Sequence, residues 1–449
     1  MSFEVRFGHE DRFLGVDIMT RPKLCLINPP HPYLNNPTAQ APLGMLYVAA
    51  SARDAGFDVS FVDLSADRID SDFDLPSAEV YGLTSTILDA KFAAAVARHI
   101  RKRFPKSKTI VGGPISISPE QIDSSLFDSI VRGEGERVIL DVLFDYPNLK
   151  GEYVGERLID LDALPFPARD MISGSLGGNV FAQRGGYFGE ESTVIATSRG
   201  CPFGCVYCAS PGIWNRRIVY RSAENVFAEI DEVEGRFGVR QFRFSDDNVT
   251  TSRRRIDDLC GMLRRKGSSI AWRASIRTVP NDLELFETLK SAGCVEASFG
   301  VESGDQDVLD ALQKQTTVED NRTAILNAKK AEMDVRILFM IGTPGETLKT
   351  VDRNIEFLES VKGKYDAIAL TNFVPLPGSK VAMDPASCSC DLLEDAEDVD
   401  NFNLCMYGPS GRNRWMNLVR PHALSLDELS SSKRRMADYI ISTGRSNHG

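Results

Sequence analysis

This sequence of 449 residues has few of the features that are typical of nucleic-acid-binding, membrane or secreted proteins. Basic residues do not dominate it, because 52 Lys and Arg stand against 63 Asp and Glu, for a net charge of −11 at pH 7. This balance disfavours nucleic acid as a partner, since phosphate binding needs a basic surface. No apolar run approaches the roughly 20 residues of a membrane span, and the N-terminus lacks the apolar core of a signal peptide. We therefore expect a cytoplasmic protein without a membrane partner.

Cysteine is also limited and unevenly placed. The nine cysteines are an odd number in a long chain, which argues against a disulfide framework. Three of them, Cys201, Cys205 and Cys208, lie in one short segment, and the other six are scattered. This distribution favours a reducing compartment and a metal-binding role for the group of three.

What is present is a repeated alternation of strand-like and helix-like segments. After an irregular arm over residues 1–22, residues 23–146 alternate short apolar runs with helical patterns such as Leu43–Ala55 and Ala90–Arg103. This pattern predicts an α/β fold, a doubly wound Rossmann-like domain. Residues 147–190 are predicted to be a linker, because prolines and glycines interrupt any regular pattern there.

A second alternation runs over residues 191–377. It contains six strand-like segments, at 193–198, 240–245, 270–275, 294–300, 335–341 and 367–373, with helical segments between them such as Ala223–Phe237. Six β/α units predict a partial (β/α)6 barrel of the TIM type. Residues 378–449 are predicted to be a C-terminal extension of loops and short helices.

The three clustered cysteines follow the first predicted barrel strand with the spacing C-x3-C-x2-C. Three thiolates on one loop can bind three irons of a cubane cluster, whereas iron–sulfur clusters normally take four cysteines. The fourth iron then keeps an exchangeable position, as catalytic metal sites do. A zinc loop with a remote fourth ligand is the alternative.

This segment resembles the signature of the radical S-adenosylmethionine (SAM) superfamily, in which a [4Fe–4S] cluster binds and cleaves SAM. The resemblance implies that Cys201, Cys205 and Cys208 are the cluster ligands and that Tyr207 lies near the adenine. Further motifs follow successive strands, at the end where such a barrel places its active site. The SAM contacts that they imply are Ser245, Asp246, Asp247, Ser275, Arg277, Glu302, Ser303, Gly342 and Pro344.

The N-terminal domain resembles the cobalamin-binding domain that precedes the barrel in one branch of this superfamily. The matching segments are Asn28-Pro29-Pro30, Pro42-Leu43-Gly44, Gly82-Leu83-Thr84, Gly112-Gly113-Pro114 and Gly133-Glu134-Gly135-Glu136. None of the five histidines stands in the D-x-H-x-x-G context that ligates cobalt in some cobalamin proteins, and Ile115 occupies a position where histidine is common. The resemblance implies cobalamin as a cofactor; a relic domain without cobalamin is the alternative.

The resemblance implies an enzyme that cleaves SAM to a 5′-deoxyadenosyl radical and takes a hydrogen atom from a small-molecule substrate. With cobalamin, the reaction would be C-methylation. Without it, dehydration, deoxygenation or rearrangement of a sugar-like substrate is expected. A reducing protein such as flavodoxin or ferredoxin would supply electrons. A non-catalytic electron carrier or sensor is the alternative from another class, and a second cluster on Cys388, Cys390 and Cys405 also stays open.

Overall fold

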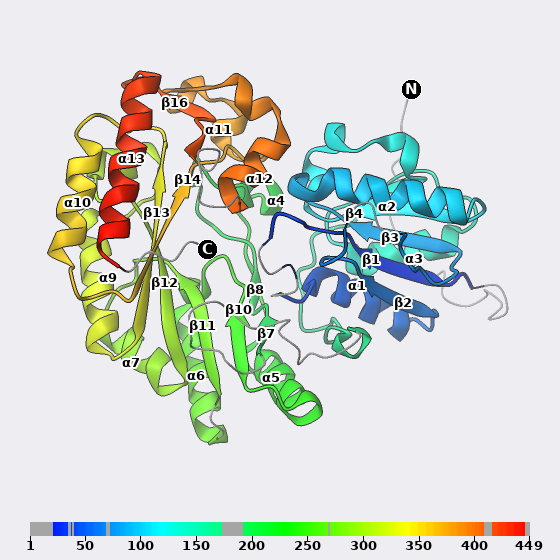
Figure 1. Cartoon of the computed structure of the whole chain (residues 1–449). Helices are drawn as coiled ribbons and strands as arrows, with labels where there is room; N and C mark the ends of the chain where they lie inside the picture. Colours follow the sequence, from blue (N-terminus) through cyan, green and yellow to red (C-terminus); the bar gives the residue numbers. More distant parts are fainter. Residues whose placement is uncertain are drawn as a thin grey trace. The chain divides into compact units, whose positions relative to one another are not determined.

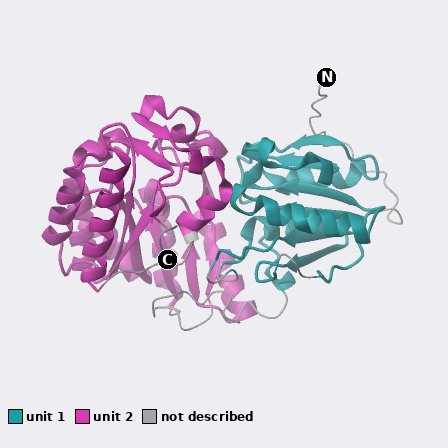
Figure 2. Ribbon diagram, turned by 45° about the horizontal axis from the view of Figure 1, so that its top comes forward, with its two compact units in different colours: residues 1–182 teal, residues 183–449 magenta. Residues whose placement is uncertain are grey.

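The computed structural model describes residues 21–34, 37, 40–68, 72–172, 192–267, 270–407 and 415–444. Most of the predicted N-terminal arm and the second half of the predicted linker lie outside these residues. The chain divides into two compact units, residues 1–182 and residues 183–449 (Figure 2).

Unit 1 is built on one parallel sheet of six strands. Their order is β2-β1-β3-β4-β5-β6, so the chain reverses direction across the sheet between β1 and β3. A ligand of a doubly wound sheet binds at such a switch point, beyond the carboxyl ends of the strands. The strands are β1 (Leu24–Asn28), β2 (Val59–Asp63), β3 (Val80–Thr84), β4 (Lys108–Gly112), β5 (Ser129–Arg132) and β6 (Gly151–Val154).

Helices cover both faces of this sheet because apolar side chains on the strands alternate between the faces. In β1, Cys25 and Ile27 pack in the same cluster as α2 (Ala90–Arg103). Leu24 and Leu26 pack in another cluster, with α1 (Leu43–Asp54) and α3 (Gly135–Asp145). The predicted doubly wound architecture is confirmed.

Strand β6 was not predicted. It lies within the segment assigned as a linker and extends the sheet by pairing in parallel with β5. Its four residues, Gly-Glu-Tyr-Val, are mostly exposed. A short edge strand with few buried residues leaves no hydrophobic alternation in the sequence, so pattern reasoning cannot detect it.

Unit 2 contains the second six-stranded parallel sheet, in the order β14-β13-β12-β11-β10-β7. Its curved sheet is lined on the outside by α5 (Ala223–Phe237), α6 (Arg253–Lys266), α7 (Leu283–Ser291), α9 (Val318–Lys330) and α10 (Thr350–Ser360) (Figure 1). The predicted partial barrel is confirmed. The strands are β7 (Ser192–Ile195), β10 (Gln241–Phe244), β11 (Ala271–Ile276), β12 (Cys294–Glu302), β13 (Asp334–Ile341) and β14 (Ala367–Asn372).

The core of unit 2 lies between this sheet and its helices. Phe244 and Trp272 are fully buried on adjacent strands and stack with ring centroids 4.5 Å apart. The last helix, α13 (Leu426–Ser442), contributes Met436 and Ile440 to the same core and runs beside α10 (Figure 1). Among the described residues, no helix is both long enough and apolar enough to cross a membrane.

Candidate active site

The cysteine loop begins immediately beyond β7. A short antiparallel pair, β8 (Ser198–Arg199) and β9 (Val219–Tyr220), flanks the loop, and α4 (Ser210–Trp214) closes it. Gly200 has a φ of +97°, and a Cβ there would lie 2.1 Å from the carbonyl oxygen of Arg217. Only glycine therefore fits where the chain leaves β8 to present the cysteines.

The three thiols share one partly buried environment. Cys205 is buried, while Cys201 and Cys208 are half-buried. Burial and, to a smaller extent, the charges of Asp247, Cys205 and Cys201 raise the pKa of Cys208 to about 11, against the opposing effect of a hydrogen bond from the backbone of Ser210. Burial also raises the pKa of Cys201. These two thiols therefore keep their protons at neutral pH until a cation compensates the charge of the thiolates, which is what a bound metal does.

No group of three or more His, Cys, Asp or Glu side chains within the described residues converges on a single metal ion. A cubane cluster does not require its ligands to converge on one ion, because each cysteine binds its own iron. The donor set of this loop, three thiols with no fourth cysteine nearby in sequence, fits such a cluster.

Arg277, which follows β11, holds the cysteine loop from one side. Its Nη1 donates to Cys205 Sγ at 3.6 Å, and its guanidinium lies 3.7 Å from the centre of the Phe203 ring. Its Nη2 donates to the carbonyl of Lys314. Arg277 was expected to contact SAM, and the structure brings it to the cysteine loop itself.

Asp246 and Asp247 follow β10 and have different surroundings. Asp246 is buried, and its carboxylate accepts hydrogen bonds from Thr197 N at 3.0 Å, Thr197 Oγ1 at 2.7 Å and Ser198 Oγ. Asp247 is exposed and accepts from Ser210 Oγ at 2.7 Å. Desolvation and the charge of Asp246 raise the pKa of Asp247. The hydrogen bonds of Asp246 thus fix the base of the cysteine loop, whereas the exposed carboxylate of Asp247 is accessible to a cationic partner.

Ser245, next to these carboxylates, is exposed, and Ser275 is half-buried near the end of β11. Ser245 Oγ donates to the carbonyl of Ile195 at 3.3 Å, which ties the ends of β10 and β7 together. The structure thus brings Ser245 to the strand ends around the cysteine loop.

Glu302 ends β12 and belongs to a buried polar group of three residues. Its Oε1 accepts from Tyr207 Oη at 3.0 Å and from Lys314 Nζ at 2.6 Å. Burial, followed by the charge of Glu302, raises the pKa of Tyr207 well above its ordinary value. The sequence did not single out Lys314, because it lies in a turn after α8 (Gln306–Ala311) with no motif around it.

An unusual backbone conformation places the Glu302 side chain beside Tyr207 and Lys314. Its φ of +64° is left-handed, which costs energy in a non-glycine residue and is concentrated at functional sites. The pairing of β12 with β13 shifts register between Gly300 and Glu302. A Cβ on Gly300 would lie 2.5 Å from Glu302 Oε1 and 3.0 Å from Lys314 Nζ, so glycine leaves the space that the ion pair fills.

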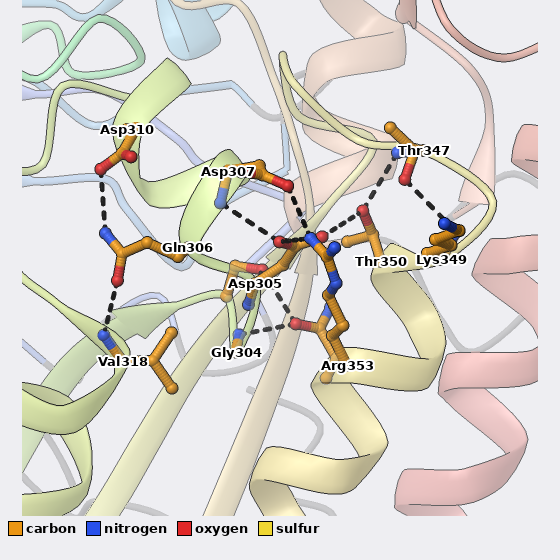
Figure 3. Close-up of polar contacts among 12 residues, drawn as sticks. Gly304, Asp305, Gln306, Asp307, Asp310, Val318, Thr347, Lys349, Thr350 and Arg353 are labelled. Atoms are coloured by element: carbon orange, nitrogen blue, oxygen red, sulfur yellow. Dashed lines mark hydrogen bonds and ion pairs between the residues drawn. The ribbon is translucent and has the colours of Figure 1, made fainter.

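Beyond Glu302, the loop is fixed to α10. Ser303 is buried and donates to Asn354 Oδ1 at 2.8 Å. Figure 3 shows Asp305 between Thr350 and Arg353, with Thr350 Oγ1 2.9 Å from Asp305 Oδ2 and Arg353 Nη1 2.5 Å from Asp305 Oδ1. The hydroxyl of Ser303 thus binds α10 in this structure, and its contact with SAM stays a prediction.

The loop after β13 carries Gly342 and Pro344 around a buried carboxylate. Glu346 Oε1 accepts from Gly342 N at 2.8 Å and from Thr343 N at 2.9 Å. Burial raises the pKa of Glu346 to about 6, and the charge of Lys433 on α13 opposes that rise. A Cβ on Gly342 would lie 2.9 Å from Lys433 Cε, so the C-terminal helix reaches this motif. No sequence motif marked Lys433.

In unit 1, the segments that resemble a cobalamin-binding domain lie at the carboxyl edge of the sheet. Asn28 ends β1, Thr84 ends β3 and Gly112 ends β4. Gly113 has a φ of +90°, and a Cβ there would lie 2.7 Å from Thr84 Oγ1. Ile115 is fully buried and therefore packs into the core of unit 1.

The three tail cysteines are buried. Cys390 Sγ donates to the carbonyl of Pro385 at 3.4 Å, whereas Cys405 accepts from Asn372 Nδ2 at 3.2 Å. Burial raises the pKa of Cys390 to about 12. The three side chains lie within the packing of the extension.

Comparison with known families agrees with this arrangement. Residues 195–358 match the radical SAM superfamily, and residues 37–143 match the B12 binding domain. The chain therefore contains a radical SAM domain that follows a B12-binding domain. A [4Fe–4S] cluster, SAM and cobalamin are the cofactors of this domain pair.

Curated relatives and solved structures share this layout. An uncharacterized methyltransferase of Pyrococcus horikoshii is 28% identical over 372 residues, 77% of this chain and 78% of the relative. Bacteriochlorophyllide d C-12(1)-methyltransferase of Chlorobaculum tepidum is 24% identical over 82% of this chain and 79% of the relative. The structure of TsrM, a radical SAM methyltransferase from Kitasatospora setae, has the same fold, with a TM-score of 0.69 at 16% identity over 94% of this chain and 90% of that one.

Proposed function

We propose that this protein methylates a carbon atom of a small molecule. The observation that carries the proposal is the presence of a B12-binding domain ahead of a radical SAM barrel on one chain. Curated relatives named as methyltransferases, which align over most of their length, support it. When bound, the cluster and SAM together supply a 5′-deoxyadenosyl radical, and cobalamin supplies a carrier for the methyl group.

Cys201, Cys205 and Cys208 are the residues that would bind three irons, with the fourth iron left for SAM. Asp246 holds the base of the cysteine loop through Thr197 and Ser198. Its role is therefore to position the loop.

Asp247 is the carboxylate that would receive the ammonium of SAM, because it is exposed at the strand end and Ser210 is its hydrogen-bond partner. A carboxylate opposite an ammonium forms a strong charge-assisted hydrogen bond. The buried Glu302–Lys314 pair fixes the hydroxyl of Tyr207, so that the aromatic ring before the last cysteine keeps one orientation toward the adenine.

A small electron-transfer protein such as flavodoxin or ferredoxin would reduce the cluster. The reductant must deliver its electron to the cluster. We therefore expect it to bind this protein near the cysteine loop, where Pro202 is exposed.

A turnover assay that measures both nucleoside products tests the proposal. Methylation of an unactivated carbon consumes two SAM, so 5′-deoxyadenosine and S-adenosylhomocysteine should form in equal amounts in the cobalamin-loaded enzyme. Protein without cobalamin should form 5′-deoxyadenosine only. Formation of 5′-deoxyadenosine alone by the cobalamin-loaded enzyme with its substrate would instead assign dehydration or rearrangement.

A further inference from the structure

Arg277 carries a buried positive charge beside the cysteine loop. It lies just beyond β11, and its side chain is buried. Within the part of the chain that the structure describes, no carboxylate forms an ion pair with it, and its Nε has no hydrogen-bond partner. A buried charge is costly unless another group compensates it. The groups that the guanidinium does contact therefore indicate which negative charge it can compensate.

Two hydrogen bonds and one aromatic ring fix the orientation of Arg277. Its backbone N donates to Asn248 Oδ1 at 3.3 Å, and its Nη2 donates to the carbonyl of Lys314. The guanidinium carbon lies 3.7 Å from the centre of the Phe203 ring, which belongs to the cysteine loop. A cation over an aromatic face is stabilised, the more so when it is desolvated. The side chain is therefore held against the loop from both ends.

The sulfur of Cys205 is the group that this orientation brings to the guanidinium. Nη1 of Arg277 donates to Cys205 Sγ at 3.6 Å, and both side chains are buried. A thiol is neutral, so this contact pairs opposite charges only after Cys205 has lost its proton. Cys205 must lose that proton to bind iron. The counter-charge of Arg277 thus arises when the loop binds its metal.

Such a contact affects the two oxidation states of a cluster unequally. Each cysteine ligand adds a negative charge, and reduction adds one more. The reduction potential of an iron–sulfur cluster depends on its net charge, on hydrogen bonds to its sulfurs and on its exposure to solvent. A buried cation that donates to a ligand sulfur therefore stabilises the reduced state more than the oxidised state.

We propose that Arg277 raises the reduction potential of the cluster through its hydrogen bond to the Cys205 sulfur. In the step that this favours, one electron passes from the reducing protein to the cluster, and no bond forms or breaks. Arg277 acts through Cys205 and is thus a positioning residue. This inference rests on the cluster binding of the proposed function but not on the fate of the methyl group. It differs from the SAM contact that the sequence motif predicted for Arg277, and the two roles give different results in one experiment.

The test is an anaerobic redox titration of the full-length protein with its cluster reconstituted, followed by EPR of the reduced cluster before SAM is added. Arg277→Gln removes the charge and should lower the equilibrium constant for reduction about tenfold or more. A tenfold change corresponds to a midpoint potential about 59 mV more negative for one electron. Arg277→Lys keeps the charge and should shift the potential less than Arg277→Gln. Iron content should equal that of the parent protein in each variant.

Two further variants separate charge from packing. Arg216→Gln is the matched control for charge: Arg216 Nε donates to the carbonyl of Pro202 in the same loop at 3.4 Å, but the side chain is exposed. Water and salt screen such a charge, so the potential should stay unchanged. Phe203→Leu removes the ring and keeps the charge of Arg277. An equal shift in Phe203→Leu and in Arg277→Gln would assign the effect to packing and overturn the inference.

A measurement on the parent protein makes the test independent of whether Arg277→Gln folds. With isotope-labelled arginine, pulsed EPR of the reduced cluster should show coupling to an arginine nitrogen, and Arg216→Gln should keep that coupling. Its absence from the parent protein overturns the inference.

The remaining outcomes separate this inference from the proposed function. An unchanged potential with weakened SAM binding in Arg277→Gln would overturn the inference and assign Arg277 to SAM. Failure of the parent protein to bind four irons would overturn both proposals. Turnover without S-adenosylhomocysteine would count against methylation alone.

Discussion

The ammonium of Lys314 lies 2.6 Å from a carboxylate oxygen of Glu302, and both side chains are almost fully buried beside Tyr207. Removing one partner of a buried ion pair leaves an uncompensated charge. We therefore expect Lys314→Met to lower the free energy of unfolding by about 3–5 kcal/mol.

Urea unfolding measures this loss. The double variant Lys314→Met with Glu302→Gln should recover a large part of it, because no buried charge remains. An equal loss in the single and the double variants would show that Lys314 stabilises the fold through packing alone.

The cluster ligands can be separated from the other cysteines by iron content. Replacing Cys201, Cys205 and Cys208 together by Ala should abolish binding of four irons after anaerobic reconstitution, because the remaining cysteines are buried in the packing of the protein. Replacing Cys388, Cys390 and Cys405 together by Ala is the matched control and should leave iron binding intact. Four irons bound to the first triple variant would contradict the assignment and favour a cluster in the C-terminal extension.

The two neighbouring carboxylates should give different phenotypes. Asp247→Asn should weaken SAM binding roughly ten- to a hundred-fold, the effect of losing a charge-assisted hydrogen bond, with normal iron content. Asp246→Asn should instead lower stability by about 1–3 kcal/mol, since an amide cannot accept all the hydrogen bonds that Thr197 and Ser198 donate. Equilibrium dialysis with SAM and thermal unfolding distinguish the two. Unchanged SAM affinity in Asp247→Asn would disprove its role.

Glu346 should make stability depend on pH. Its pKa is about 6 in the folded protein, against 4.5 for an ordinary Glu side chain. The folded state thus keeps its proton to higher pH than the unfolded chain does, so stability falls as pH rises from 4.5 to about 6. At about 1.4 kcal/mol per pH unit, the loss is about 2 kcal/mol. Urea unfolding of the parent protein and of Glu346→Gln across this range should show the loss only in the parent.

Cobalamin should bind without a protein histidine on cobalt, because no histidine has the sequence context for it. His31, just beyond β1, is the histidine nearest in sequence to the carboxyl edge of that strand, and burial lowers its pKa. The EPR spectrum of the bound cob(II)alamin should lack coupling to a protein nitrogen, and His31→Ala should leave the spectrum unchanged. A nitrogen-coupled signal that disappears in His31→Ala would refute this expectation.

The bounds of long helices with a regular apolar pattern were predicted well. The helix predicted at 90–103 has the same bounds in the structure, and so does the helix predicted at 223–237. Each has a buried stripe repeated every three or four residues, which is the signal that sequence periodicity carries. Strand β6 was missed because its short, exposed edge leaves no such signal.

The sequence by itself determined the two α/β units and the cysteine loop, because strand periodicity and cysteine spacing are local properties of the chain. The motifs of that loop and of the later strand ends carried the resemblance to the radical SAM superfamily. Only the tertiary structure distinguished buried Asp246 from exposed Asp247 and joined Lys314 to Glu302. These residues lie on different strands and turns. Strand register and the direction of each side chain decide which of them meet, and residues far apart in sequence come together only when the barrel folds.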